Sequence, residues 1–284
     1  MTTQPRNVAR VVRARDTSDG AGVRLKRSLG SQELPELDPF LLLDEFRSDD
    51  ANDYIAGFPD HPHRGFETVT YMLAGHMEHR DHMGNRGDLA PGSVQWMTAG
   101  RGIIHSEMPR QEQGLMWGFQ LWVNLPAKDK LCAPRYQDIP PDAVPELELA
   151  GGAGSVRLVA GSYAGKPGAV SGIATDPLYL DFRLVPHAEL SVPVPLGHRA
   201  LSYVYAGEAW LGSTPGTHLA AAQLAVLDDG DSLSVRAGAG GARLLVIAGK
   251  PLNEPIVRHG PFVMNTREQI TQAVRDYQSG RLLG

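Results

Sequence analysis

The stretch Gly57-Phe-Pro-Asp-His-Pro-His-Arg-Gly-Phe-Glu-Thr68 contains two histidines, His61 and His63, that are separated by one residue. Further along, Gln95-Trp-Met-Thr-Ala-Gly-Arg-Gly-Ile-Ile-His-Ser-Glu-Met108 repeats this spacing with His105 and Glu107. Residues two apart in an extended strand point to the same face. Each pair can therefore direct both of its side chains into one cavity, and the two pairs together predict a metal site.

The predicted ligands narrow the choice of metal. Three neutral imidazoles and one carboxylate suit Fe(II), Mn(II), Ni(II), Cu(II) or Zn(II). A structural zinc site is closed and tetrahedral, whereas an octahedral ion with four protein ligands keeps two positions open for oxygen or substrate. The carboxylate favours iron in a redox role. Glu67 follows His63 by four residues and faces the same cavity if the strand is unbroken, so spacing does not choose between Glu67 and Glu107.

The composition is typical of a globular, strand-rich chain. Of the 284 residues, 42% are hydrophobic and 21% are charged. The 32 glycines and 21 prolines, with few long helical patterns, favour many short strands joined by turns. The net charge of -5, without a basic stripe, argues against direct binding of nucleic acid. The single cysteine, Cys132, excludes an internal disulfide framework and a thiolate zinc site.

The chain carries no sign of a membrane or secretory segment. No apolar run is long enough to span a bilayer, and the N-terminus lacks a secretory core. We therefore expect a cytoplasmic protein without a membrane partner. We also expect it to be a monomer.

One helix is predicted, at the C-terminus, from about Arg267 to Gln278. Thr266 can cap this helix, and Gln269 completes a capping box three residues later. Gly280 is placed to end it.

Proline and glycine divide the chain into regions. They are dense in residues 131–168, which we interpret as a linker between an N-terminal domain, 1–130, and a C-terminal domain, 169–284. The second domain contains no pair of ligands at the spacing described above, so we expect metal in the first domain alone.

A weak internal repeat agrees with two similar halves. Tyr71-Met-Leu-Ala-Gly75 is similar to Tyr203-Val-Tyr-Ala-Gly207. Downstream, the predicted turn at Ala90–Gly92 is matched to Asp229–Asp231.

A second group of histidines lies at helical spacing. His76, His79 and His82 stand between Gly75 and Gly84 among charged residues. This context is typical of a polar hairpin tip, so we expect these histidines to be exposed rather than to form a second metal site.

Longer stretches make the chain similar to a known family. Besides the two segments quoted first, they are Asp38-Pro-Phe-Leu-Leu-Leu-Asp-Glu-Phe46, Leu121-Trp-Val-Asn-Leu125 and Gly260-Pro-Phe-Val-Met-Asn-Thr266. With these motifs the chain resembles a pirin over nearly its whole length. Pirins are bicupins, so the resemblance implies an all-β fold of two antiparallel, jelly-roll-like barrels that face each other. It also implies that a short C-terminal helix packs back toward the N-terminal half.

The resemblance implies a site and two kinds of function. It places metal, usually iron, on His61, His63, His105 and Glu107, and so favours Glu107 over Glu67. Some bacterial pirins resemble quercetin 2,3-dioxygenases, which open a flavonol or similar phenol with O2; here Glu107 would be both ligand and catalytic base. The alternative is a redox-sensing iron protein that binds a transcription factor or metabolic enzyme. An unrelated oxygenase or isomerase is a third reading.

Overall fold

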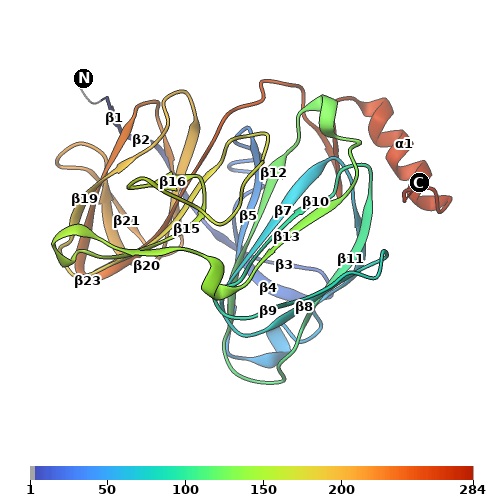
Figure 1. The fold of residues 1–284 in the computed structure, drawn as a ribbon, viewed down its shortest axis with the longest axis horizontal. Helices are drawn as coiled ribbons and strands as arrows, with labels where there is room; N and C mark the ends of the chain where they lie inside the picture. The colour runs from blue at the N-terminus through green and yellow to red at the C-terminus, as the bar shows by residue number, and fades with distance from the viewer. Residues whose placement is uncertain (1–3, 284) are drawn as a thin grey trace. The chain divides into compact units, whose positions relative to one another are not determined.

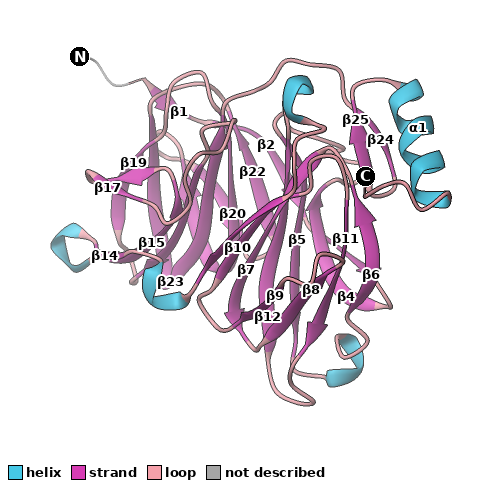
Figure 2. Ribbon diagram, turned by 45° about the vertical axis from the view of Figure 1, so that its right-hand side comes forward, coloured by secondary structure: helices cyan, strands magenta, loops and turns pink. Residues whose placement is uncertain are grey.

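The computed structural model describes residues 4–283, and strands make up most of that chain (Figures 1 and 2). The predicted all-β class is therefore confirmed. Two compact units are present. Unit 1 combines Met1–Arg15, Ser31–Leu37 and Ala143–Pro251, and unit 2 combines Asp16–Gly30, Asp38–Asp142 and Leu252–Gly284. Each unit is thus assembled from segments that are separated in sequence. The predicted division at one linker, 131–168, does not represent this arrangement.

The described part of unit 2 is built on two main sheets, to which the C-terminal segment adds a small two-stranded one. The larger has the strand order β13-β10-β7-β12-β5-β4-β3. Its strands are β3 (Arg15–Asp19), β4 (Val23–Leu29), β5 (Phe40–Ser48), β7 (Phe66–Ala74), β10 (Val94–Thr98), β12 (Met116–Asn124) and β13 (Arg135–Ile139). The smaller has the order β6-β11-β8-β9, with β6 (Phe58–His63), β8 (Met77–Asp81), β9 (Arg86–Leu89) and β11 (Ile103–Pro109). The stretch interpreted as a linker therefore supplies an edge strand, β13, to the larger sheet.

Apolar side chains from both sheets form one core in unit 2. Phe46 of β5 and Met72 of β7 belong to the same buried cluster as Met77 of β8 and Leu89 of β9. Since these side chains meet, the two sheets pack face to face. On β7 the even-numbered residues, such as Met72, point to this core because side chains alternate along a strand.

Gly65 lies at the corner where the chain passes from β6 into β7. Its φ of 88° is a left-handed conformation that favours glycine. A Cβ atom there would lie 2.1 Å from the carbonyl oxygen of Val263, so no larger residue fits. The Lys130 ammonium donates to the Gly65 carbonyl oxygen at 2.7 Å and also to that of Val263 at 3.0 Å, and so links the corner to the C-terminal segment.

The C-terminal segment adds β24 (Val257–His259), β25 (Phe262–Met264) and the helix α1 (Arg267–Gln278), red in Figure 1. The predicted helix and capping box are confirmed. The Thr266 side chain accepts from the backbone N–H of Gln269, and the Gln269 side-chain oxygen accepts from the backbone N–H of Thr266. Ile270 and Ala273 bury against β25. The described chain contains no helix long and apolar enough to cross a membrane.

Unit 1 is built on one ten-stranded sheet, whose main path is β14-β15-β18-β23-β20-β22-β2. Its strands are β1 (Pro5–Arg6), β2 (Val8–Arg13), β14 (Glu146–Glu148), β15 (Gly154–Ala160), β18 (Leu178–Leu184), β19 (Glu189–Pro193), β20 (Arg199–Leu211), β21 (Thr217–Ala220), β22 (Gln223–Leu227) and β23 (Ser232–Gly249). A small ribbon pairs β16 (Ser162–Tyr163) with β17 (Lys166–Pro167). The described residues also include four single 3-10 turns: Ala51–Asp53, Ala127–Asp129, Pro141–Ala143 and Ala150–Gly152.

One local arrangement occurs in both units and corrects the internal repeat. The Gly92 amide donates to the Met72 carbonyl at 2.7 Å, and the Ala222 amide donates to the Val204 carbonyl at 2.8 Å. Met72 and Val204 follow the two tyrosines that were matched, so that part of the match agrees with the structure. The proposed counterpart of Gly92 at Asp229–Asp231 is wrong. The equivalent residue is Ala222, which adopts a φ of 64° without being glycine and so left no visible sign in the sequence.

Candidate metal centre

β6 and β11 bring the three predicted histidines onto one face. The strands are adjacent and antiparallel, and His105 lies directly opposite His61. Directly opposed residues share a face, and His63 shares that face because it is two residues from His61. The register shifts after His105, so Glu107 lies opposite Phe58. The spacing of one residue between the paired ligands in the sequence thus corresponds to a convergence of three imidazoles in the structure.

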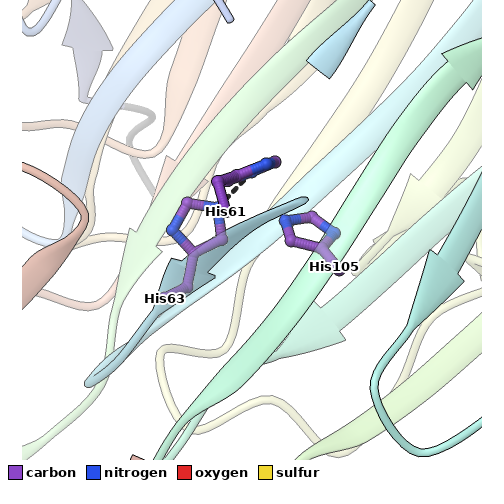
Figure 3. Close-up of side chains that lie close together, drawn as sticks. All are labelled: His61, His63 and His105. Atoms are coloured by element: carbon purple, nitrogen blue, oxygen red, sulfur yellow. Dashed lines mark hydrogen bonds between the residues drawn. The ribbon is translucent and has the colours of Figure 1, made fainter. Parts of the chain in front are cut away.

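The three rings are in contact with one another (Figure 3). Their centroids are 4.3 Å apart for His61 and His105, 4.7 Å for His61 and His63, and 4.9 Å for His63 and His105. One nitrogen from each ring lies within 4.8 Å of the others. Within the described residues, this is the one group of three or more histidine, cysteine or acidic side chains so placed.

The hydrogen bonds around the rings leave one nitrogen atom each of His61, His63 and His105 close to the others. The His61 Nδ1 atom lies 2.8 Å from the Pro59 carbonyl oxygen, which can only accept, so in the neutral ring Nδ1 donates and Nε2 carries the lone pair. That Nε2 atom faces Nε2 of His63 at 3.1 Å. The buried Nε2 atom of His105 has no hydrogen-bond partner among residues 4–283. Buried polar atoms rarely stay unsatisfied, and a cation among these nitrogens would satisfy them.

Burial keeps the rings in the form that binds metal. Burial lowers the pKa of His63 well below its usual value, and the neighbouring His61 adds to the effect. Burial likewise lowers the pKa of His105, with contributions from His63, His61 and His79. His63 and His105 are therefore neutral at neutral pH, as a metal ligand must be.

Glu107 lies beside this group but does not belong to the cluster of donor atoms within 4.8 Å. Its carboxylate is buried and accepts a hydrogen bond from Thr70 Oγ1 at 2.8 Å. Thr70 Oγ1 also lies 2.7 Å from the side-chain oxygen of Gln120. One hydroxyl proton cannot serve both acceptors fully, so an ionised Glu107 is best served when Gln120 turns its NH2 group toward Thr70.

Glu67, the other carboxylate that spacing allowed, lies on a different surface. Gly65 ends the path of β6, so Glu67 belongs to β7 in the larger sheet. It is three residues from Thr70 and therefore points to the opposite face of β7 from the residue that contacts Glu107. There it accepts a hydrogen bond from Thr98 Oγ1 at 2.6 Å.

The prediction that His76, His79 and His82 are all exposed is wrong for His79. His76 and His82 are exposed, but His79 is 1% exposed. β8 does form a hairpin with β9, but its other neighbour, β11, places His79 opposite Glu107 and buries it. The signal available in the sequence was Met77, an apolar residue that shares a strand face with His79 because it lies two positions before it. His79 Nδ1 lies 3.3 Å from Nδ1 of His105.

A pocket of about 540 Å³ opens onto the site. His61, His63 and Glu107 line its polar wall, while Phe58, Met77 and Trp122 are among its apolar residues. The Arg258 guanidinium, also at this pocket, lies 4.6 Å from the centroid of the Trp122 ring. A largely apolar cavity of this size with a few convergent polar groups is typical of small-molecule sites.

Two β-rich units, one of which carries converging histidines beside a pocket, define the chain as a bicupin. The family comparisons agree: residues 22–123 match the pirin family model, and residues 179–283 match the model of the pirin C-terminal cupin domain. The chain belongs to the pirin family, as predicted.

Individual relatives are similar over almost the full chain. A Pseudomonas aeruginosa protein named "Putative quercetin 2,3-dioxygenase" is 53% identical and covers 99% of both chains. Human pirin is 43% identical over 95% of this chain and 91% of its own. A crystal structure of quercetin 2,3-dioxygenase from Acinetobacter baumannii aligns with a TM-score of 0.89 and 32% identity, covering 98% of each chain.

Proposed function

We propose that this protein is a metal-dependent dioxygenase, similar to quercetin 2,3-dioxygenase, that opens flavonols or other enolisable phenols with O2. One observation carries the proposal: His61, His63 and the buried Glu107 carboxylate line a pocket of about 540 Å³, and the imidazole of His105 converges with those of the first two. The names of the Pseudomonas and Acinetobacter relatives support the same chemistry.

The proposed ligands are His61, His63, His105 and Glu107, and the proposed metal is Fe(II). The donor set also accepts Mn(II), Ni(II), Cu(II) or Zn(II). When bound, the metal supplies a Lewis acid and a redox partner for O2.

The chain's own residues would prepare the substrate. Glu107 takes the proton of the flavonol hydroxyl, because it is the carboxylate beside the imidazoles and inside the pocket. Thr70 holds that carboxylate in place through its 2.8 Å hydrogen bond. The Trp122 ring offers a flat apolar surface to an aromatic substrate. The apolar wall around it excludes water from the reacting groups.

The test is anaerobic loading with Fe(II), or with each alternative metal, followed by quercetin and O2. We expect metal-dependent loss of the flavonol absorption band, matched by oxygen uptake and release of carbon monoxide. Glu107→Gln should abolish this loss, and His76→Gln, at an exposed position, should not affect it. Metal-loaded protein that leaves quercetin intact with every metal would refute the flavonol reaction. The alternative, a redox-dependent regulator, would then be tested by capture of a stoichiometric protein partner.

The ligand assignment has a separate test. His61→Ala and His105→Ala should each lose metal, measured by elemental analysis, while circular dichroism shows the fold retained. Unchanged metal content in both variants would refute the assignment.

A further inference from the structure

His79 contacts the ring of His105 on the side away from the converging nitrogens. Nδ1 of His105 lies 3.3 Å from Nδ1 of His79, whereas the buried Nε2 of His105 has no hydrogen-bond partner within the part of the chain that the structure describes. The two rings are 5.0 Å apart between centroids. His79 is not among the three donors grouped within 4.8 Å. It therefore stands behind a ligand rather than beside the ion.

Two further residues extend this contact outward from His79. Nε2 of His79 lies 3.2 Å from the Tyr136 hydroxyl, and the Tyr136 and His79 rings pack edge to face at 5.0 Å. The Tyr136 hydroxyl in turn hydrogen-bonds the Asp81 carboxylate. Tyr136 belongs to β13, and Asp81 to the same strand as His79. Three strands of unit 2 thus supply the chain His105, His79, Tyr136 and Asp81.

For neutral imidazoles, the last member fixes the direction of every hydrogen bond in this chain. An ionised carboxylate only accepts, so the Tyr136 hydroxyl donates to Asp81. Burial raises the pKa of Tyr136, and its bond to Asp81 raises it further, so the hydroxyl keeps its proton. Its oxygen is then the acceptor for Nε2–H of His79, which leaves Nδ1 of His79 without a proton. That Nδ1 atom accepts from Nδ1–H of His105, and Nε2 of His105 carries the lone pair.

We propose that His79 is a positioning residue, backed by Tyr136 and Asp81, that holds His105 with its Nε2 lone pair facing His61 and His63. The inference rests on the proposed metal centre and deepens it. Residues that hydrogen-bond the second nitrogen of a metal-bound histidine fix its tautomer and ring orientation. Without His79, the buried Nδ1–H of His105 has no acceptor in this arrangement, and the ring is free to reorient.

The experiment compares two substitutions at residue 79. Asn carries its amide oxygen near the position of Nδ1 and can still accept from His105, whereas Leu fills the space without an acceptor. Binding of Co(II), a spectroscopic probe, is measured by competition with a chelator, and the absorption spectrum of the bound ion is recorded. We expect His79→Leu to weaken binding by about 10- to 100-fold and to change the spectrum. His79→Asn should recover most of the affinity, and His76→Gln should match the unaltered protein.

If His79 had a purely structural role, the substitutions would lower thermal stability, but His79→Leu and His79→Asn would have the same Co(II) affinity and the same spectrum. Unchanged affinity and spectrum in His79→Leu overturn the inference. Should that variant not fold, Tyr136→Phe replaces it, because this change removes only the hydroxyl; unchanged binding there has the same meaning. Failure of the unaltered protein to bind Co(II) would instead overturn the metal centre itself, so the two failures are distinct.

Discussion

Replacing Lys130 tests how the corner beside His63 is held together. The Lys130 side chain is 1% exposed, and its ammonium donates to three oxygens. They are the carbonyl oxygens of Gly65 at 2.7 Å and Val263 at 3.0 Å, and the side-chain oxygen of Asn124 at 2.7 Å. Burial lowers the pKa of Lys130 to about 8, so the group is still mainly charged at pH 7. Lys130→Met keeps most of the volume and removes the charge and all three donors.

The expected loss follows from two opposing contributions. Hydrogen bonds to a charged group contribute about 1.5–3 kcal/mol each, or about 4–9 kcal/mol for three. Removing a buried charge returns several kcal/mol of desolvation cost. We therefore expect Lys130→Met to lower the free energy of unfolding by about 2–4 kcal/mol.

The assay is urea unfolding of metal-free protein at pH 7, followed by circular dichroism and by tryptophan fluorescence. Lys128→Met is the matched control, because Lys128 is exposed in the same segment; it should change stability by less than about 0.5 kcal/mol. A loss below about 1 kcal/mol in Lys130→Met would refute the reasoning. It would show that the desolvation of the ammonium cancels its hydrogen bonds.

Three further outcomes are expected. Burial lowers the pKa of His63 and of His105, so below about pH 6.5 the unfolded chain binds more protons than the folded chain. As the pH falls, the free energy of unfolding of metal-free protein should therefore decrease by up to about 1.4 kcal/mol per pH unit for each of these two histidines. Urea titrations at several pH values measure this slope, and an equal slope in His63→Gln would contradict it. Thr70→Val removes the donor to Glu107 and should lower kcat for flavonol loss by about tenfold or more at unchanged metal content; an unchanged kcat counts against the role. Thr266→Ala should cost about 1 kcal/mol in urea unfolding, and no change would disprove the cap.

Local patterns predicted those features that depend on neighbours in sequence. The spacing of His61 and His63 carried over because β6 is extended, and the capping box carried over because Thr266 and Gln269 are within one turn. The choice between Glu67 and Glu107 was different. It depends on Gly65, where the chain turns from the sheet of β6 into the sheet of β7. The spacing of residues in the sequence does not show where a strand ends.

Features that depend on distant segments were not predictable in the same way. His79 was expected at an exposed hairpin tip because of its charged neighbours, while the pairing of β8 with β11 makes it a buried strand residue. Tyr136 lies in a stretch interpreted as a linker, and it acquires a role only because β13 pairs with β10. Such roles arise from strand pairing over long sequence separations, which a periodic pattern does not contain.

The unequal exposure of the three imidazoles sets a route for exchange. His105 is 1% exposed and His63 is 3% exposed, whereas His61 is half-buried and lines the pocket. An ion held by these rings would therefore enter and leave past His61, through the pocket that a substrate also occupies. An aromatic molecule bound in the pocket would then block this route. It would slow both the uptake of the ion and its removal by a chelator. The rate of metal exchange, measured with and without a pocket ligand, becomes a direct report on occupancy of the pocket.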